Sequence, residues 1–489
     1  PIMSYYNGNQ FENHKREMDY SSQGNNYNWG YDPHGYFSPT GMYSEDPTHS
    51  ELKIAELKEL IAEIHKRGMG VVLDVVYNHN PRAEIFEDLV PSYYHFMDIN
   101  GNPKESYGGG KFGTTHKMSR KLLVDSIKYW TDEYKVDGFR FDLMGDHDAD
   151  TIQLAYDEAK KLNSNVVMIG EGWRLYDGDD GEESVMAADQ GWMAFTDSAG
   201  SFSDDIRNEL KSGHGIEGQP RFITNGARSI QKIFNNIKAQ PGNFTADDPG
   251  DVVQYIEAHD DLTLHDIIAL SIKKDPAKHE EEIQKRIRLG NTFILTSQGT
   301  SFIHAGQEYG RTKQWLAEGQ PESDFTYMVD ENGNPFEHPY FIRNSFDSTD
   351  AINMFDWSKV TKPGIHKETM EYTKGLIKLR RSTDAFRLET KELVDSNVTL
   401  IEAPEMKSMD LLIAYKNVTS NQKEAYYVFV NGDAKERTLT LKTDLTSGKV
   451  VADSDEVNVE GVSKKSGFKL TKTNITIEPL TSVIIKMKN

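Results

Sequence analysis

Residues 136–142 read Val-Asp-Gly-Phe-Arg-Phe-Asp, an apolar run that starts at a glycine and ends in a carboxylate. Such a run predicts a buried strand with Asp142 at its C-terminal end. In a barrel of parallel strands, that end carries the chemistry. Side chains alternate along a strand, so Arg140 and Asp142 are expected on the same face. The segment alone fits a structural ion pair as well as a functional site.

Three other segments repeat this pattern of an apolar run followed by polar groups. They are residues 71–79, which end in His79, residues 166–173, which contain Glu171 and Trp173, and residues 251–260, which end in His259 and Asp260. Apolar residues at helical spacing occur at 51–67, 118–135, 150–162 and 279–295. Strands that alternate with helices predict βαβ units and a parallel sheet.

Polar groups at successive strand ends favour a (β/α)8 barrel of the TIM type, with a doubly wound open sheet as the alternative. No Gly-x-Gly-x-x-Gly opens a helix, which argues against a dinucleotide site. After about residue 386 the pattern changes to short alternating runs, at 411–416, 425–430, 438–442 and 482–488. These runs predict an all-β sandwich. We therefore expect a catalytic barrel in residues 1–386 and a β-sandwich domain in residues 387–489.

Composition limits the functional classes. The chain has 489 residues, which exceeds one compact core and indicates at least two domains. Its net charge of −22 disfavours nucleic acid and anionic membranes as partners. The absence of cysteine excludes disulfides, thiolate metal ligands and cysteine nucleophiles. No apolar run is long enough to predict a membrane span.

Three carboxylates, Asp142, Glu171 and Asp260, fall at the ends of three predicted strands. One interpretation is metal-assisted hydrolysis, although no His-x-x-x-His pair supplies ligands. The other is glycoside cleavage, which needs one carboxylic acid and one carboxylate. Arg140 is expected to lower the pKa of Asp142 and keep it ionised. Trp173 is expected to help desolvate Glu171 and keep it protonated.

Several segments, in order, resemble glycoside hydrolase family 13, the α-amylase clan. They are residues 74–79, 138–142, 170–173 and 259–260. Residues 27–33, Tyr-Asn-Trp-Gly-Tyr-Asp-Pro, look like the signature of type I pullulanases within that family, and residues 304–308 and 344–348 look similar too. The resemblance spans nearly the whole chain.

The resemblance implies roles for residues at the matching positions. Asp142 would be the nucleophile, Glu171 the acid and base, and Asp260 a stabiliser of the transition state. The implied substrate-binding residues are Tyr31, Asp32, His79, Arg140, Trp173 and His259. The implied reaction is retaining hydrolysis of α-1,6 branch links in pullulan, branched starch and glycogen-derived dextrins. An α-1,4-acting or isoamylase-like member, or an inactive glycan-binding protein, are the alternatives.

The same resemblance sets expectations about cofactors, partners and location. No cofactor is required for the chemistry, and a structural calcium ion is a family-level expectation without assigned ligands. The acidic loop 177–183 has oxygen ligands, but it lacks the EF-hand spacing, and a solvated loop is favoured. Only about 70 residues precede Asp74, so we expect the first barrel strand to come from a longer protein or a separate chain. A polymeric substrate favours an extracellular or bacterial cell-surface location.

Overall fold

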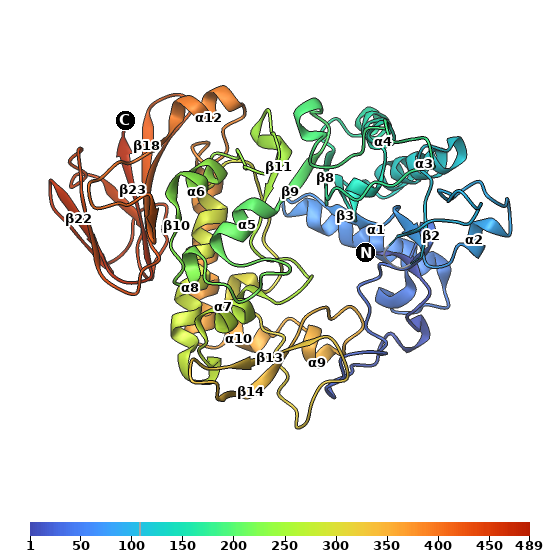
Figure 1. Cartoon of the computed structure of the whole chain (residues 1–489), viewed down its shortest axis with the longest axis horizontal. Coiled ribbons are helices and arrows are strands. Elements are labelled where there is room, and N and C mark those ends of the chain that lie inside the picture. The colour runs from blue at the N-terminus through green and yellow to red at the C-terminus, as the bar shows by residue number, and fades with distance from the viewer. Residues whose placement is uncertain (107–108) are drawn as a thin grey trace. The chain divides into compact units, whose positions relative to one another are not determined.

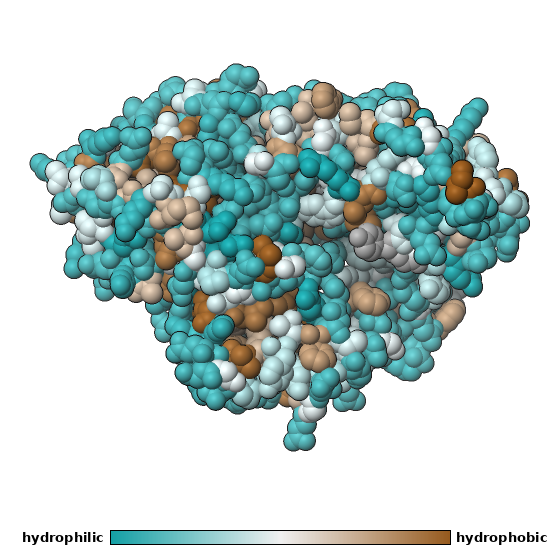
Figure 2. Space-filling view, in the orientation of Figure 1, coloured by the Kyte–Doolittle hydropathy of each residue, from teal (hydrophilic) through white to brown (hydrophobic). Residues whose placement is uncertain are grey.

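The computed structural model describes residues 1–106 and 109–489 (Figure 1). The chain divides into two compact units. The first contains residues 1–202 and 346–350, and the second contains residues 203–345 and 351–489. Among the described residues, no helix combines the length and the apolar character needed to cross a membrane. The face seen in Figure 2 is mainly hydrophilic, with hydrophobic side chains in small separate groups.

A parallel sheet forms the centre of the first unit. Its strands are β3 (Val72–Val75), β7 (Gly138–Phe141), β8 (Val167–Gly170) and β9 (Gly200–Ser203). Strand β7 pairs with β3 on one side and with β8 on the other, and β8 pairs with β9. All four residues of β7 are buried, as expected for a strand covered on both faces. A Cβ at Gly138 would lie 2.3 Å from the Val167 carbonyl oxygen, so a glycine is required where β7 approaches β8.

Three long helices accompany this sheet: α1 (Ser50–Lys66), α3 (Lys117–Glu133) and α4 (Ala149–Leu162). Helices α3 and α4 lie side by side (Figure 1) and bury an apolar stripe that includes Leu123, Ile127 and Ile152. Asp148 caps α4, because its side chain accepts a hydrogen bond from the Thr151 amide. The other elements of the unit are β1 (Met3–Tyr5), β2 (Pro33–Pro39), β4 (His79–Asn80), α2 (Glu84–Glu87), β5 (Glu105–Ser106) and β6 (Gly109–Lys111).

The second unit contains the parallel pair β11 (Val252–Gln254) and β12 (Thr300–Ser301). Its helices are α5 (Asp204–Leu210), α6 (Ile230–Ile237), α7 (Leu264–Ile272), α8 (Pro276–Thr296), α10 (Trp357–Thr361), α11 (Ile365–Ser382) and α12 (Lys391–Asn397). Helices α8 and α11 pack against each other, and both contribute to one large apolar core. An antiparallel hairpin, β13 (Phe325–Val329) and β14 (Pro335–Ile342), adds Met328 and Phe341 to that core.

The C-terminal part of the second unit is a sandwich of two antiparallel sheets. One sheet has the order β15-β17-β18-β23-β20 and the other has the order β19-β22-β21. The strands are β15 (Val398–Leu400), β17 (Leu412–Val418), β18 (Glu424–Asn431), β19 (Arg437–Thr440), β20 (Lys449–Ala452), β21 (Phe468–Leu470), β22 (Asn474–Ile477) and β23 (Thr481–Lys488). Leu412 and Phe429 of the larger sheet share a buried cluster with Leu439 and Ile475 of the smaller one. Ile413 faces the other way, into the core with α8 and α11.

The predicted alternation of strands and helices and the predicted C-terminal β-sandwich are confirmed. The strand predicted at 251–260 is shorter, because β11 ends at Gln254 and the segment that carries Asp260 continues without strand pairing. The predicted domain boundary between residues 386 and 387 stays a prediction.

Candidate active site

Arg140 and Asp142 meet at the C-terminal end of β7. The Arg140 Nη1 atom lies 3.1 Å from an Asp142 carboxylate oxygen, and the Asp142 amide donates to the Val75 carbonyl of β3 at 2.9 Å. Only 14% of the Asp142 side chain and 11% of the Arg140 side chain are exposed. The pair predicted from alternation along the strand is therefore formed, and it is largely shielded from water.

Glu171 joins the same guanidinium from the end of β8. Its Oε1 atom lies 3.1 Å from Arg140 Nη2, and its Oε2 atom accepts the Leu143 amide at 3.0 Å. Leu143 reaches this position in the left-handed region, with φ of 40°, which is unfavourable for a residue with a side chain. A Cβ at Gly145 would lie 1.8 Å from the Trp173 carbonyl oxygen, so a glycine is required where the two strand ends approach each other.

Asp74 is the residue that the sequence analysis did not assign to the site. It lies opposite Arg140 in the register of β3 and β7, and it accepts an Arg140 hydrogen bond at 2.9 Å. Its second oxygen accepts the Tyr31 hydroxyl at 2.5 Å. The Arg140 guanidinium also lies over the Tyr31 ring, 5.8 Å from its centre. The sequence does contain a signal for this role, because Asp74 is the one charged residue in the otherwise apolar run 71–76. A charge in a buried strand requires a partner.

The Arg140 guanidinium thus contacts three carboxylates, and the balance between these charges affects the pKa of Asp142. Burial and the neighbouring Glu171 carboxylate raise the pKa of Asp142 well above its ordinary value, while Arg140 opposes the shift. The predicted net lowering of the Asp142 pKa is therefore wrong: Arg140 acts in the predicted direction, but desolvation outweighs it. The facing carboxylates raise the pKa of Arg140 further, so it stays charged.

His79 and Asp32 lie on the Tyr31 side of the first unit. The His79 Nε2 atom is 2.9 Å from the Tyr31 carbonyl oxygen, which requires Nε2 to carry the proton. Burial lowers the pKa of His79, so the ring is neutral and rigidly oriented. Burial also raises the pKa of Asp32, whose carboxylate accepts the Asn7 side-chain amide at 2.6 Å. The conformation of Tyr31 is thereby fixed at both its backbone and its hydroxyl.

Trp173 follows Glu171 by two residues and is half-buried, with its carbonyl accepting the Leu175 amide at 2.9 Å. His259 and Asp260 belong to the second unit, where the His259 Nε2 atom lies 3.7 Å from an Asp260 carboxylate oxygen. Half of the Asp260 side chain is exposed. That Asp260 joins Asp142 and Glu171 in one site stays a prediction.

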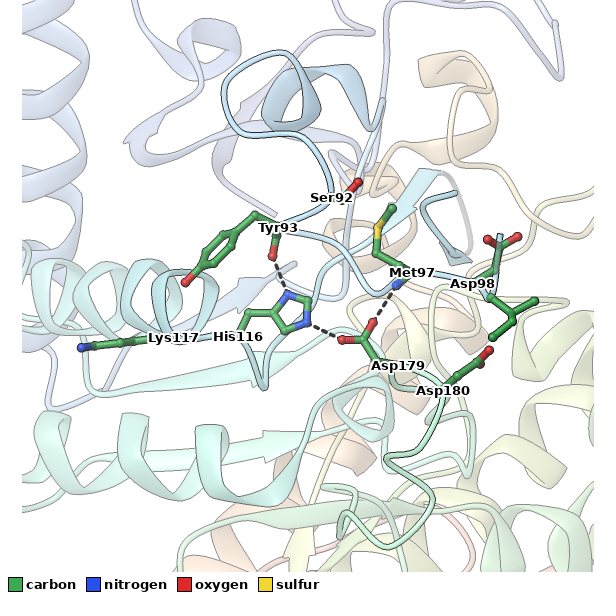
Figure 3. A pocket seen from close by; sticks show the side chains of 9 residues that line it. Ser92, Tyr93, Met97, Asp98, His116, Lys117, Asp179 and Asp180 are labelled. Carbon is green, nitrogen blue, oxygen red and sulfur yellow. Dashed lines mark hydrogen bonds and ion pairs between the residues drawn. The ribbon is translucent and has the colours of Figure 1, made fainter. Parts of the chain in front are cut away.

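The acidic loop 177–183 is held by positively charged and polar groups of the first unit. Asp179 accepts the Met97 amide at 2.7 Å and lies 2.6 Å from His116 Nε2, and Figure 3 shows it pointing at both partners. Lys104 lies 2.8 Å from Asp177. A pocket of 440 Å³ beside this loop is lined by Tyr93, Met97, His116 and Asp179 among others, and by none of the predicted site residues.

The described residues contain one group of side chains with ligand atoms close enough for a metal ion, His214, Glu217 and Asp261. Arg343 already lies 2.9 Å from both Glu217 and Asp261. A cation at this position would have to displace that guanidinium, so the donor set does not fit a metal site well.

The arrangement in the first unit suits general acid and nucleophilic chemistry on one bond. Two largely buried carboxylates contact one guanidinium, so a nucleophile and a second carboxyl group lie beside the same positive charge. Tyr31 supplies a fixed aromatic ring beside them. This combination is what glycoside cleavage requires.

Comparison with known proteins agrees with this chemistry. A family described as "SpuA C-terminal" matches residues 397–488. Pullulanase A of Streptococcus pneumoniae serotype 2 is 52% identical over 506 residues, covering all of this chain and 40% of the relative. The chain thus spans about 40% of the length of the curated relatives that it matches first.

Solved structures match over the whole fold. The catalytic module of the multi-modular glycogen-degrading pneumococcal virulence factor SpuA, in complex with an inhibitor, has a TM-score of 0.96 and 52% identity. The match covers 99% of this chain and 71% of that one. The Group B Streptococcus pullulanase SAP in complex with maltotetraose has a TM-score of 0.95 and 54% identity, covering all of this chain and 64% of that one. The predicted fold class, a TIM-type α/β barrel followed by a β-sandwich, is confirmed.

Proposed function

Because the chain belongs to the SpuA-type pullulanases of glycoside hydrolase family 13, we propose that it hydrolyses α-1,6-glucosidic branch links with retention of configuration. The substrates are pullulan, branched starch and glycogen-derived dextrins. The observation that carries the proposal is the contact of Asp142 and Glu171 with the same Arg140 guanidinium, each at 3.1 Å.

In the first step, the Asp142 carboxylate attacks the anomeric carbon as the bond to the leaving oxygen breaks. Glu171 gives its proton to that oxygen, which leaves as a free hydroxyl. The product is a glucosyl ester of Asp142. In the second step, Glu171 removes a proton from water, which attacks the same carbon and releases Asp142. Two inversions give net retention.

The raised pKa of Asp142 is a property of the free site, in which burial and the neighbouring Glu171 carboxylate disfavour its ionised form. A leaving-group oxygen that accepts a hydrogen bond from Glu171 favours the proton on Glu171. Arg140 then stabilises the ionised Asp142 that must attack. Substrate binding therefore divides the roles between the two carboxylates.

Tyr31, Asp32, His79 and Arg140 would contact the glucose unit whose bond is broken. The bonds that fix Tyr31 and His79 support this role, because a rigid site loses less entropy on binding. Asp260 and His259 would hold sugar hydroxyls in the transition state, and Trp173 would stack on the acceptor side. The chemistry needs no cofactor, since side chains supply the acid, the nucleophile and the positive charge. A calcium ion would be structural.

The relatives support the substrate class and the location. SAP was solved with maltotetraose, and SpuA is described as a glycogen-degrading virulence factor of a pathogen. From these descriptions we infer that this protein binds α-glucans and is part of a larger multi-modular chain. The description of SpuA as a virulence factor supports an extracellular or cell-surface location for this protein.

Digestion of pullulan tests the proposal. The protein is expected to release maltotriose, with reducing ends that increase with time. An Asp142→Asn variant, prepared in the same way, controls for contaminating activity. Panose or isopanose as the product would show cleavage of α-1,4 links. Release of no sugar would indicate a glycan-binding protein.

A further inference from the structure

The β13–β14 hairpin has an unusual outer face. Its strands lie side by side in Figure 1, with Phe325 paired to Ile342 and Tyr327 paired to Tyr340. Side chains alternate across a strand, so Thr326, Met328 and Phe341 face the opposite way from Tyr327 and Tyr340. Met328 and Phe341 are fully buried in the core of the second unit.

Outward positions of such a hairpin are normally polar. Here they carry three aromatic rings, Phe325, Tyr327 and Tyr340, which we name the aromatic face. The Tyr340 ring lies 5.3 Å from the Tyr327 ring and 5.2 Å from the Phe325 ring. Tyr327 is 50% exposed, and the other two are half-buried. Ile342, which pairs with Phe325 on this face, is fully buried, whereas the three rings do not belong to the core cluster that Met328 and Phe341 join.

The base of the hairpin is tied to the segment that carries Asp260. Arg343, directly after β14, lies 2.9 Å from Asp261, and the Asp261 amide donates to the Asn344 side chain at 3.0 Å. The Lys313 ammonium donates to the carbonyl oxygens of Asp261, at 2.5 Å, and of Arg343. Tyr340 is three residues from Arg343. At the rise of about 3.3 Å per residue in a strand, the aromatic face begins about 10 Å from Arg343.

We propose that the aromatic face is an accessory binding surface for α-glucan chains, on which glucose rings stack beyond the residues that surround the cleaved link. The inference rests on the proposed function, because Asp260 marks the substrate side of the second unit only if the chain acts on α-glucans. Aromatic rings offer a flat apolar surface, and the two tyrosines add hydroxyls for polar contacts at the ring edge.

A protein partner fits this surface less well. A stable protein interface covers about 800 Å² on each partner. Three aromatic side chains bury roughly 150–250 Å² each when fully covered, and two of these are already half-buried. Even if fully covered, the three rings together would therefore bury less than such an interface requires, whereas a glucan chain can stack on single rings.

The test compares a polymer with a short substrate, using the full chain. The double variant Tyr327→Ser/Tyr340→Ser is expected to bind glycogen about tenfold more weakly in affinity gel electrophoresis, as for the loss of two stacking contacts. Its kcat/KM on a soluble hexasaccharide with one α-1,6 link should stay within about twofold of the parent. The single variant Tyr327→Phe keeps the ring and should bind glycogen as the parent does.

Controls separate the possible failures. Phe195→Ser removes a 73% exposed aromatic ring of the first unit and should leave glycogen binding unchanged. The single variant Tyr327→Ser, at a half-exposed position, replaces the double variant if circular dichroism shows that the latter does not fold. Unchanged glycogen binding in a folded variant would overturn the inference, as would an equal loss on the hexasaccharide or a change in oligomeric state. Failure of the parent to cleave the hexasaccharide would count against the proposed function instead.

Discussion

Replacing Arg140 with methionine tests how the site balances its charges. The variant keeps the aliphatic stem but leaves Asp74, Asp142 and Glu171 without the cation that contacts all three. A contact between unit charges near 3 Å is worth roughly 5 kcal/mol at an effective dielectric constant of 20. Asp74 is 31% exposed, so its contact with Arg140 contributes the least of the three to stability, because solvent screens it. Loss of one partner from a buried ion pair typically costs about 3–5 kcal/mol.

The expected result has two parts. Without Arg140 the pKa of Asp142 rises further, so the acidic limb of the pH profile of kcat/KM should move up by more than about one unit. The variant should also lose more stability to urea at pH 7 than at pH 5. The sign follows because carboxyl groups with a raised folded-state pKa destabilise the fold as pH rises and they ionise.

A matched control is Arg437→Met in the C-terminal sandwich. Arg437 lies 2.9 Å from Asp410 and 3.2 Å from Asp433 and is 20% exposed. Its loss should lower stability without moving the acidic limb. If Arg140→Met left both the limb and the stability unchanged, the shared guanidinium would not govern the protonation of the site.

The remaining predictions concern turnover, pH stability and metal dependence. Asp142→Asn should lower kcat by more than about 10³-fold while glycogen binding persists, as isothermal titration would show, because the nucleophile alone is lost; a variant with a tenth of the parental rate would contradict the assignment. The flanking carboxylates Asp266 and Glu280, each 2.9 Å from the ring, raise the pKa of buried His265 to about 10. A shift from 6.5 corresponds to at most roughly 4–5 kcal/mol. This stabilisation is complete below pH 6.5 and is lost as pH rises towards 10, so the urea midpoint of His265→Gln should approach the parental value over that range; a constant difference would argue for a packing role. Dialysis against EDTA should leave kcat per folded molecule unchanged, and a loss of kcat that calcium restores would place a metal in the chemistry.

Much of the fold follows from periodicity. The spacing of Leu52 to Ile64 predicts α1, and the apolar runs before Asp142 and Glu171 predict β7 and β8, because long helices and fully buried strands leave unambiguous patterns. The strand before Asp260 was predicted too long. The run 252–258 is mainly apolar, but after Gln254 it is buried without strand pairing. A pattern of burial does not distinguish a paired strand from a buried loop.

The contact between Arg140 and Asp142 was predictable from the sequence, but the electrostatics around it were not. Strand alternation places Arg140 beside Asp142, and that contact is present. Sequence spacing could not reveal that Asp74 and Glu171 contact the same guanidinium, because the register of three strands decides it. The net direction of the Asp142 pKa depends on this sharing and on burial, and both arise only in the folded structure.

Asp142 is proposed as the nucleophile of a retaining α-1,6-glucanase. Brief incubation with a fluorinated α-glucosyl fluoride, followed by peptic digestion and mass spectrometry, tests it most directly. The fluorine slows hydrolysis of the glucosyl ester, so the intermediate accumulates. One added fluoroglucosyl group is expected on the peptide that contains Asp142, located on that residue by fragmentation. A label on another carboxylate, or turnover of a natural branched substrate without any covalent intermediate and with inversion, would contradict it.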